Sequence, residues 1–312
     1  MYFPYLRGKT FELGALKEVA PNLNPKNIAP IVEPVQKSNN PLKKAIIALN
    51  AHGVIPHIIL NPEVGKLTGI PLEDMFKDFA DSKTKLVYVP CIRINKANAK
   101  VALTFVNQLH EDNIRFSLYI QEMIDFDISG WVNLSCANII KNLGNYPSDF
   151  ANSLKNTVLV NAPFLKKDRN ADYDEDPKYF SDAHLTYTKP VVTNQIGFGD
   201  FLIITDKWDP SKGGPAYVVA LHLTYISNQD SIMYIKHCKS TSDSKTQLNT
   251  AKKFQEALAA LVAFANGESS VDKTTVGYKG LESLIGKPLP HLGVPKKLSM
   301  MHQMETLSKF IG

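Results

Sequence analysis

Five short segments of this chain share one pattern, in which a run of apolar residues ends in a hydrogen-bonding residue. Each segment is rich in Ile, Val, Leu, Phe and Tyr and is bounded by Pro, Asn or Asp, which is typical of buried strands. The segments are residues 28–33, 55–61, 86–93, 116–122 and 157–161. Helix-like stretches separate the first four, so the pattern predicts βα units that form a parallel sheet.

The polar residues that close these segments are the first candidate site. In a parallel sheet the carboxyl ends of the strands lie at one edge, and α/β proteins bind their ligands at that edge. The residues expected there are Glu33, Asn61, Arg93, Gln121, Glu122 and Asn161.

The chain changes in character after residue 161. Residues 166–176 are highly charged and mixed in sign, which is typical of a solvated loop, although long loops in compact domains are often functional. Apolar segments beyond this loop predict further strands, of which the last two form a hairpin. These segments are residues 184–187, 198–208, 217–226 and 232–238.

Helical periodicity complements the strands. It predicts helices at residues 131–143 and 247–264, and shorter helical pieces after residue 269. We therefore expect one α/β domain over residues 1–312, an irregular TIM-like barrel with a mixed or antiparallel second half. Residues 269–312 would be a helical C-terminal extension packed on it. The alternative is an open mixed α/β sheet.

Composition places the chain among ordinary globular proteins, with 44% hydrophobic residues, 21% charged residues and a net charge of +5. Three cysteines without Cys-x-x-Cys spacing argue against a disulfide framework and a structural zinc site, and predict a cytoplasmic protein. No stretch reaches about 18 uninterrupted apolar residues, so we expect no membrane span.

The strand-end residues could support chemistry. Glu33 and Glu122 could bind a divalent metal cation as a cofactor, or divide the roles of general acid and base. Arg93 could hold a phosphate or carboxylate in its fork. The alternative is a buried ion pair between Arg93 and a carboxylate that only closes the barrel, because structural networks also cluster charges. The amides expected to orient a substrate are Asn61, Gln121 and Asn161.

Three further groups of residues are candidates. In and just after the charged loop, Asp172, Asp182 and His184 could be metal ligands, or a general base with its orienting carboxylate. Arg169 and Tyr173 are candidate binding residues beside them. Asp200 follows a Gly-Phe-Gly sequence that precedes a predicted strand. In a dinucleotide-binding site the glycines instead follow a strand and open a helix, so we expect these glycines to allow close backbone packing. His222 could meet a second histidine at a metal, although two histidines are too few ligands.

Several stretches of sequence resemble a known family. They are Met-Tyr-Phe-Pro-Tyr-Leu-Arg-Gly-Lys (1–9), Pro-Ile-Val-Glu-Pro-Val (30–35), Arg-Asn-Ala-Asp-Tyr (169–173), Gly-Phe-Gly-Asp-Phe (197–201) and Ala-Leu-His-Leu-Thr-Tyr (220–225). In this order they are similar to the beta-protein family, named after a satellite-phage protein and found in prophages and bacterial islands. The resemblance implies an association with anti-phage defence and a partner protein encoded by a neighbouring gene. It implies no catalytic residues.

Two functions follow as hypotheses. In the first, the protein is a component of a phage-defence or prophage-encoded system that binds a partner protein or nucleic acid. In the second, it is a hydrolase or nuclease-like enzyme that uses Glu33, Arg93, Glu122 and Asp172 with a divalent metal. The chain lacks the Walker A, Gly-x-Ser-x-Gly, His-Glu-x-x-His and EF-hand patterns, which favours the binding function.

Overall fold

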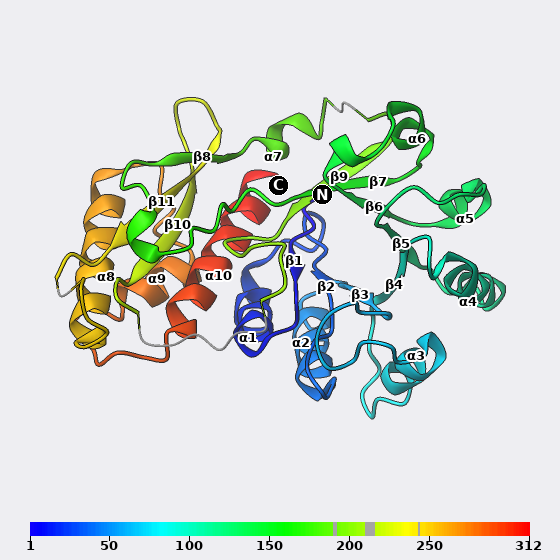
Figure 1. The fold of residues 1–312 in the computed structure, drawn as a ribbon, viewed down its shortest axis with the longest axis horizontal. Coiled ribbons are helices and arrows are strands. Elements are labelled where there is room, and N and C mark those ends of the chain that lie inside the picture. The colour runs from blue at the N-terminus through cyan, green and yellow to red at the C-terminus, as the bar shows by residue number, and fades with distance from the viewer. Residues whose placement is uncertain (190–191, 210–215, 243) are drawn as a thin grey trace. The chain divides into compact units, whose positions relative to one another are not determined.

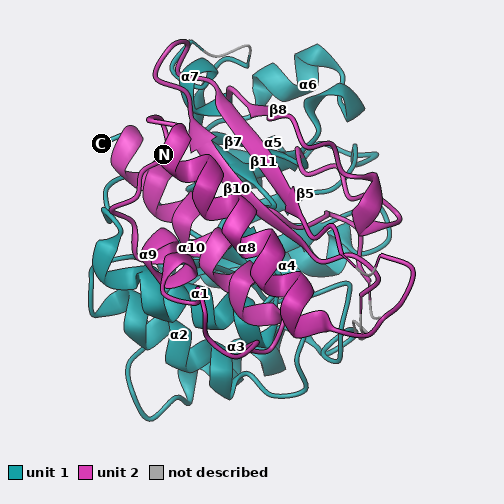
Figure 2. Ribbon diagram, turned by 90° about the vertical axis from the view of Figure 1, so that its left-hand side faces the viewer, with its two compact units in different colours: residues 1–162, 183–201, 311–312 teal, residues 163–182, 202–310 magenta. Residues whose placement is uncertain are grey.

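The computed structural model describes residues 1–189, 192–209, 216–242 and 244–312. They form two compact units, coloured separately in Figure 2. Unit 1 comprises residues 1–162, 183–201 and 311–312, and unit 2 comprises residues 163–182 and 202–310. Because compactness alone does not define a domain, the hypothesis of a single domain stays a prediction.

Unit 1 contains a parallel sheet of eight strands in the order β1-β2-β3-β4-β5-β6-β7-β9. An isolated bridge between Tyr2 and Phe198 joins the first and last strands, and the backbone N–H of Phe3 donates to the Phe198 carbonyl at 2.8 Å. The sheet is therefore a nearly closed barrel, which confirms the predicted TIM-like fold. The strands are β1 Tyr5–Leu6, β2 Ile31–Val32, β3 His57–Ile59, β4 Val89–Ile94, β5 Ser117–Ile120, β6 Asn138–Lys141, β7 Thr157–Asn161 and β9 Gln195–Asp200.

Helices connect the barrel strands and surround them (Figure 1). Proline lies at the start of α2, and Gly53 follows its end with φ +75°, a conformation that glycine adopts readily. Helices cover the outer face of the sheet and side chains fill its inner face. The strands are therefore largely apolar, and every residue of β4 is buried. The helices are α1 Thr10–Val19, α2 Asn40–Asn50, α3 Leu72–Ala80, α4 Ala99–Glu111, α5 Ser129–Leu134, α6 Ser148–Ser153 and α7 Ala183–Thr186, with short 3-10 turns at Ala20–Asn22 and Leu143–Asn145.

The seam between β1 and β9 depends on two glycines. A Cβ atom at Gly199 would lie 2.3 Å from the carbonyl oxygen of Phe3, and one at Gly197 would lie 2.5 Å from the Phe3 ring. Any other residue would force β1 away from β9. The close backbone packing predicted for the Gly-Phe-Gly sequence is confirmed.

Three predicted elements are wrong. Residues 131–143 are not one helix, because they contain the end of α5 and the strand β6. Residues 184–187 are not a strand and fall largely in α7. The strand predicted at 198–208 begins and ends earlier, as β9, and Leu202 just beyond it has φ +55°. Short apolar runs do not distinguish a buried strand from a buried helix, which explains the first two errors.

Unit 2 contains an antiparallel sheet in the order β10-β11-β8, the predicted antiparallel second half. The expected hairpin is confirmed, since β10 and β11 pair with His222 opposite His237. Helix α8 packs on this sheet through ring contact between Tyr225 and Phe264, and α10 bonds it through His302. The elements are β8 Lys178–Ser181, β10 Ala220–Ile226, β11 Met233–Lys239, α8 Thr250–Gly267, α9 Val276–Glu282, α10 Gly293–Phe310 and the 3-10 turn Asn170–Asp172.

The last part of the chain is helical, as expected, because α9 and α10 lie within residues 269–312. These two helices pack on each other, and α10 packs on β10 of unit 2. Among the residues described above, none belongs to a helix that is long and apolar enough to cross a membrane.

Candidate functional site

The carboxyl end of the barrel brings three side chains from three neighbouring segments into one buried network. Arg93 Nη2 donates to Glu33 Oε1 and to the Tyr5 hydroxyl, both at 2.8 Å, and the Tyr5 hydroxyl donates to Glu33 Oε2 at 2.8 Å. Arg93 is 4% exposed and Glu33 is 2% exposed. The guanidinium also stacks over the Tyr119 ring, 5.0 Å from its centroid. Strand alternation directs all of these residues into the barrel.

Electrostatics keeps Tyr5 and Arg93 of this network protonated. Burial raises the pKa of Tyr5 well above its ordinary value, so the phenol remains a donor for Glu33. Burial alone would lower the pKa of Arg93, but the neighbouring Tyr5 and Glu33 raise it above its ordinary value. Arg93 therefore stays charged beside Glu33, and the two charges compensate each other in a site that is almost fully buried.

A fourth member, Glu63, lies at the solvent side of the network. Arg93 Nη1 donates to Glu63 Oε2 at 2.7 Å, and the Glu63 side chain is 41% exposed. Gln121 Nε2 donates to the same oxygen at 2.7 Å, and Asn95 Nδ2 donates to Glu63 Oε1 at 3.2 Å. Glu63 thus forms the outer partner of Arg93.

Asn61 has a structural place in the same network. Its amide accepts from the Arg93 backbone N–H at 2.8 Å and donates to the Arg93 carbonyl at 2.7 Å. The side chain thereby continues the pairing of β3 with β4 by one more residue. This pairing fixes the backbone from which Arg93 projects.

The structure brings together four of the six predicted strand-end residues, namely Glu33, Asn61, Arg93 and Gln121. Glu122 is exposed and accepts from the Lys96 backbone N–H at 2.9 Å, and Asn161 is exposed at the end of β7. Neither contacts Arg93. Glu33 and Arg93 form the buried ion pair that the sequence offers as an alternative to a catalytic site, and a catalytic role for them stays a prediction.

Asp200 lies outside this network. It is 4% exposed and accepts from the Tyr2 hydroxyl at 2.9 Å. Tyr2 stacks on Phe198 at 5.2 Å, so alternation places Asp200 on the Tyr2 side of the sheet and not on the side of Tyr5.

The remaining candidates belong to unit 2. Tyr173 is only 4% exposed, and its ring lies 4.8 Å from His222 and 4.5 Å from His237. Nδ1 atoms of the two histidines lie 2.7 Å apart, and Phe164 packs edge-on against His222. We call Phe164, Tyr173, His222 and His237 the histidine cluster. Burial lowers the pKa of His222 well below its ordinary value and that of His237 to about 4, so both rings are neutral at neutral pH.

Arg169 and Asp172 are exposed neighbours of this cluster. Arg169 Nε and Nη2 donate to the two Asp172 oxygens at 3.0 and 2.8 Å, and this bond lowers the pKa of Asp172. Within the described ranges, no three His, Cys, Asp or Glu side chains are arranged to hold a metal ion. The divalent-metal hypothesis therefore lacks a ligand set in this part of the chain.

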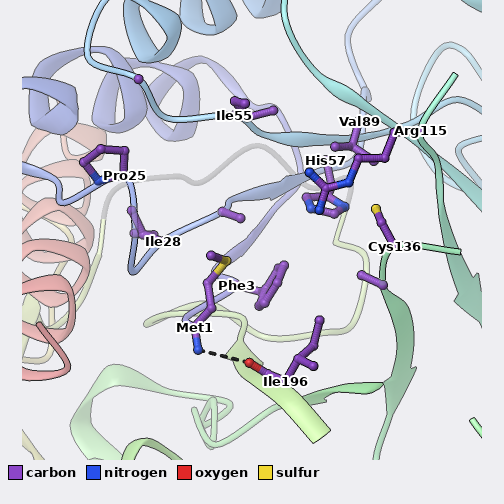
Figure 3. Close-up of a pocket in the computed structure, with 13 residues that line it drawn as sticks. Met1, Phe3, Pro25, Ile28, Ile55, His57, Val89, Arg115, Cys136 and Ile196 are labelled. Atoms are coloured by element: carbon purple, nitrogen blue, oxygen red, sulfur yellow. Dashed lines mark hydrogen bonds between the residues drawn. The ribbon is translucent and has the colours of Figure 1, made fainter. Parts of the chain in front are cut away.

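The opposite, amino end of the barrel holds a cavity of about 290 Å³ (Figure 3). Its polar lining side chains are His57 at the start of β3, Arg115 just before β5 and Cys136 just before β6. Burial raises the pKa of Cys136, which keeps its sulfur a thiol, although the nearby Arg115 opposes this shift.

Sequence reasoning missed Tyr5, Glu63, His57 and Arg115. Tyr5 belongs to a strand of two residues, too short for a recognisable pattern. Glu63 follows its strand by several residues. His57 and Arg115 lie at the amino ends of strands, whereas the rule for ligand sites concerns the carboxyl ends. The position of Arg115 directly before a predicted strand is the one signal for it in the sequence.

Neither a protein-family model nor a curated protein matches this chain.

Proposed function

We propose that this protein is a cytoplasmic binding component of a phage-defence or prophage-encoded system, related to the beta-protein family. Its charged loop over residues 166–176, together with the preceding Leu165, binds a partner protein, the product of a neighbouring gene. The observation that carries the proposal is that this charged loop is bonded to the sheet of unit 2 along its inner side while its outer side chains remain exposed. A surface fixed before binding loses little conformational entropy when a partner docks.

The inner side of the loop supports the proposal through several contacts. Tyr173 is buried in the histidine cluster. Asn170 Nδ2 donates to the Val218 carbonyl at 2.8 Å, and Lys239 Nζ donates to the Ala171 carbonyl at 3.1 Å. Lys236 Nζ donates to the Glu175 carbonyl. Both lysines lie on β11, so the sheet of unit 2 holds the loop along its length.

The outer side of the loop offers both apolar and charged contacts. Leu165 is 75% exposed, and the side chain of Arg169 is 79% exposed and paired with Asp172. An exposed leucine beside a fixed arginine pair is suited to a protein partner, which buries apolar area and pairs charge. The mixed sign of the loop argues against nucleic acid, whose phosphates require clustered positive charge.

The barrel end supports binding over catalysis only indirectly. Arg93 and Glu33 use their charges on each other, and a catalytic acid or base requires a group that can reach a substrate. We therefore assign the function to unit 2.

The test measures the affinity of the neighbouring gene product for the full chain by isothermal titration calorimetry. Leu165→Asp and Arg169→Glu should each weaken binding by about tenfold or more, because each places charge against a complementary surface. Leu248→Asp is the matched control, since Leu248 is 71% exposed in unit 2 but lies outside the loop. Equal affinity for both loop variants and the wild type would overturn the proposal, as would an equal loss in the control.

A further inference from the structure

The cavity at the amino end of the barrel contains a cation without a carboxylate partner. The described residues that line it include no Asp or Glu, and Arg115 forms no ion pair with any residue that the structure describes. Its polar neighbour in the cavity is the thiol of Cys136, whose pKa it lowers against the effect of burial. A guanidinium beside apolar walls that has no anion of its own is a site for an anion supplied from outside.

A second polar group in the cavity is also incompletely used. His57 is 5% exposed, and its Nδ1 lies 2.9 Å from the Ser117 hydroxyl, within the barrel. Among the described residues, none forms a hydrogen bond with His57 Nε2. Figure 3 shows the imidazole beside Arg115 at the same wall of the cavity. This ring nitrogen is therefore open to a hydrogen bond with water or with a ligand in the cavity.

The charge state of His57 limits the total charge of the site. Burial, and then the positive charge of Arg115, lowers the pKa of His57 to about 3. The imidazole is therefore neutral at physiological pH, and Arg115 is the single charge among the side chains that line the cavity. Burial lowers the pKa of the Met1 α-amino group, which also lines it, to about 6, so this amine is mostly neutral at pH 7. A single cation compensates a monoanion and leaves a dianion such as phosphate half unpaired.

The rest of the wall is apolar. It includes Phe3, Ile28, Ile55, Val89 and Ile196, which come from barrel strands or the segments before them. The cavity of about 290 Å³ is large enough to admit a small molecule as well as water. The space therefore suits a small molecule with an apolar body.

We propose that this cavity binds a small monocarboxylate with an aromatic or aliphatic body, whose carboxylate pairs with Arg115 and accepts a hydrogen bond from His57 Nε2. In this complex the Ser117 hydroxyl donates to His57 Nδ1, which leaves the proton on Nε2. The carboxylate takes the place of water at Arg115, and the ring or chain of the ligand contacts the apolar wall.

Ligand-observed NMR on the full chain tests the class of ligand, with sodium benzoate and sodium hexanoate as probes. Benzamide is the neutral isostere of benzoate, and inorganic phosphate is the dianionic competitor. We expect one of the two carboxylates to bind and benzamide to bind roughly 10- to 100-fold more weakly, because it loses a charge-assisted hydrogen bond. Equal binding of benzamide, tighter binding of phosphate, or no binding of either carboxylate at about 10 mM (roughly −2.7 kcal/mol) would overturn the proposal.

Two variants locate the site. Arg115→Gln should weaken carboxylate binding about 10- to 100-fold, while Lys100→Gln, which removes an exposed positive charge on α4, should leave it unchanged. Ile196→Trp should fill the cavity and abolish binding, while Ile47→Trp, a matched change of an exposed isoleucine on α2, should not. Both cavity residues are partly exposed, so their variants are expected to fold. Unchanged affinity in Arg115→Gln would refute the assigned role of the guanidinium.

Cys136 provides a readout that is independent of affinity. It is partly exposed and lines the cavity, whereas Cys91 and Cys238 are buried. A bound carboxylate should slow alkylation of Cys136 by iodoacetamide several-fold, as followed by mass spectrometry. Protection of Cys136 that persists in Arg115→Gln would contradict the proposal.

Discussion

The two ends of the barrel use arginine in opposite ways. At the carboxyl end, Arg93 is 4% exposed and is compensated by Glu33 and Glu63 at 2.8 and 2.7 Å. At the amino end, Arg115 is exposed and lines a cavity whose described walls carry no carboxylate. At the end where barrel enzymes place their active sites, the charge of Arg93 is therefore paired within the protein. The opposite end keeps a charge available for a ligand.

This difference shows that position in a fold does not by itself identify a site. A buried charge requires compensation from the protein's own side chains, whereas an exposed charge is solvated by water and remains able to pair with a ligand. Arg93 illustrates the first case and Arg115 the second. Whether a charge is paired within the protein therefore distinguishes a structural network from a binding site. The fold alone would point to the carboxyl end.

The two ends should differ most in the stability lost when their arginine is replaced by methionine. Arg93→Met leaves Glu33 buried without its cation, so we expect the free energy of unfolding to fall by about 3–5 kcal/mol. Arg115→Met removes a charge that no carboxylate compensates, so we expect a change within about 0.5 kcal/mol. Urea denaturation of both variants measures these values. Similar losses in the two variants would remove the contrast between the ends.

A smaller loss should follow from a change at the seam that joins β1 to β9. In Gly199→Ala the new methyl group meets the carbonyl oxygen of Phe3, and we expect a loss of about 1–3 kcal/mol. Gly130→Ala is the matched control, because a Cβ there has no atom within 4 Å. Gly130 lies in α5, where alanine should be neutral or slightly stabilising. Urea denaturation that finds Gly199→Ala as stable as the wild type would contradict the packing at the seam.

Acid should weaken the amino end progressively. The pKa of His57 in the folded protein is about 3, below its value of 6.5 in the unfolded chain, so the unfolded state binds more protons between these values. Stability is then complete above pH 6.5 and falls as the pH decreases toward about 4, by about 1.4 kcal/mol per pH unit for each such buried histidine. His302 in unit 2, with a pKa of about 4, adds to the same slope.

The measurement is the free energy of unfolding from urea titrations between about pH 7 and about pH 4. His57→Gln, which retains a polar group beside Ser117, should reduce the slope by the contribution of one histidine. The exposed His110 provides the control as His110→Gln. A flat profile in the wild type, or an unchanged slope in His57→Gln, would show that His57 is not held neutral by the fold.

The sequence predicts the carboxyl end better than the amino end for a physical reason. Apolar runs locate the ends of β2 and β4, so Glu33 and Arg93 follow directly from the pattern. The partners Tyr5 and Glu63 do not, because neither ends a recognisable apolar run. Their contacts exist only after the strands are placed side by side.

The amino end depends almost wholly on tertiary structure. Phe3 lies against β9 because Gly197 and Gly199 have no side chain in its way. This contact joins the first and last segments of the barrel, and the local periodicity of the sequence does not predict it. His57 and Arg115 come from different segments, and the cavity between them exists only in the closed barrel. The strand β6 is equally hard to predict, since a run with only two adjacent isoleucines fits either a strand or a helix.

The most direct test of the contrast follows the side-chain Nε resonances of the chain's four arginines in one ¹⁵N NMR titration with sodium benzoate. Arg93 Nε is buried and has no hydrogen-bond partner among the described residues, so its signal should be protected from solvent exchange and unmoved by the ligand. The Arg115 signal should shift with saturation. A shift at Arg93, or an Arg115 signal that does not respond while another arginine does, would contradict the account.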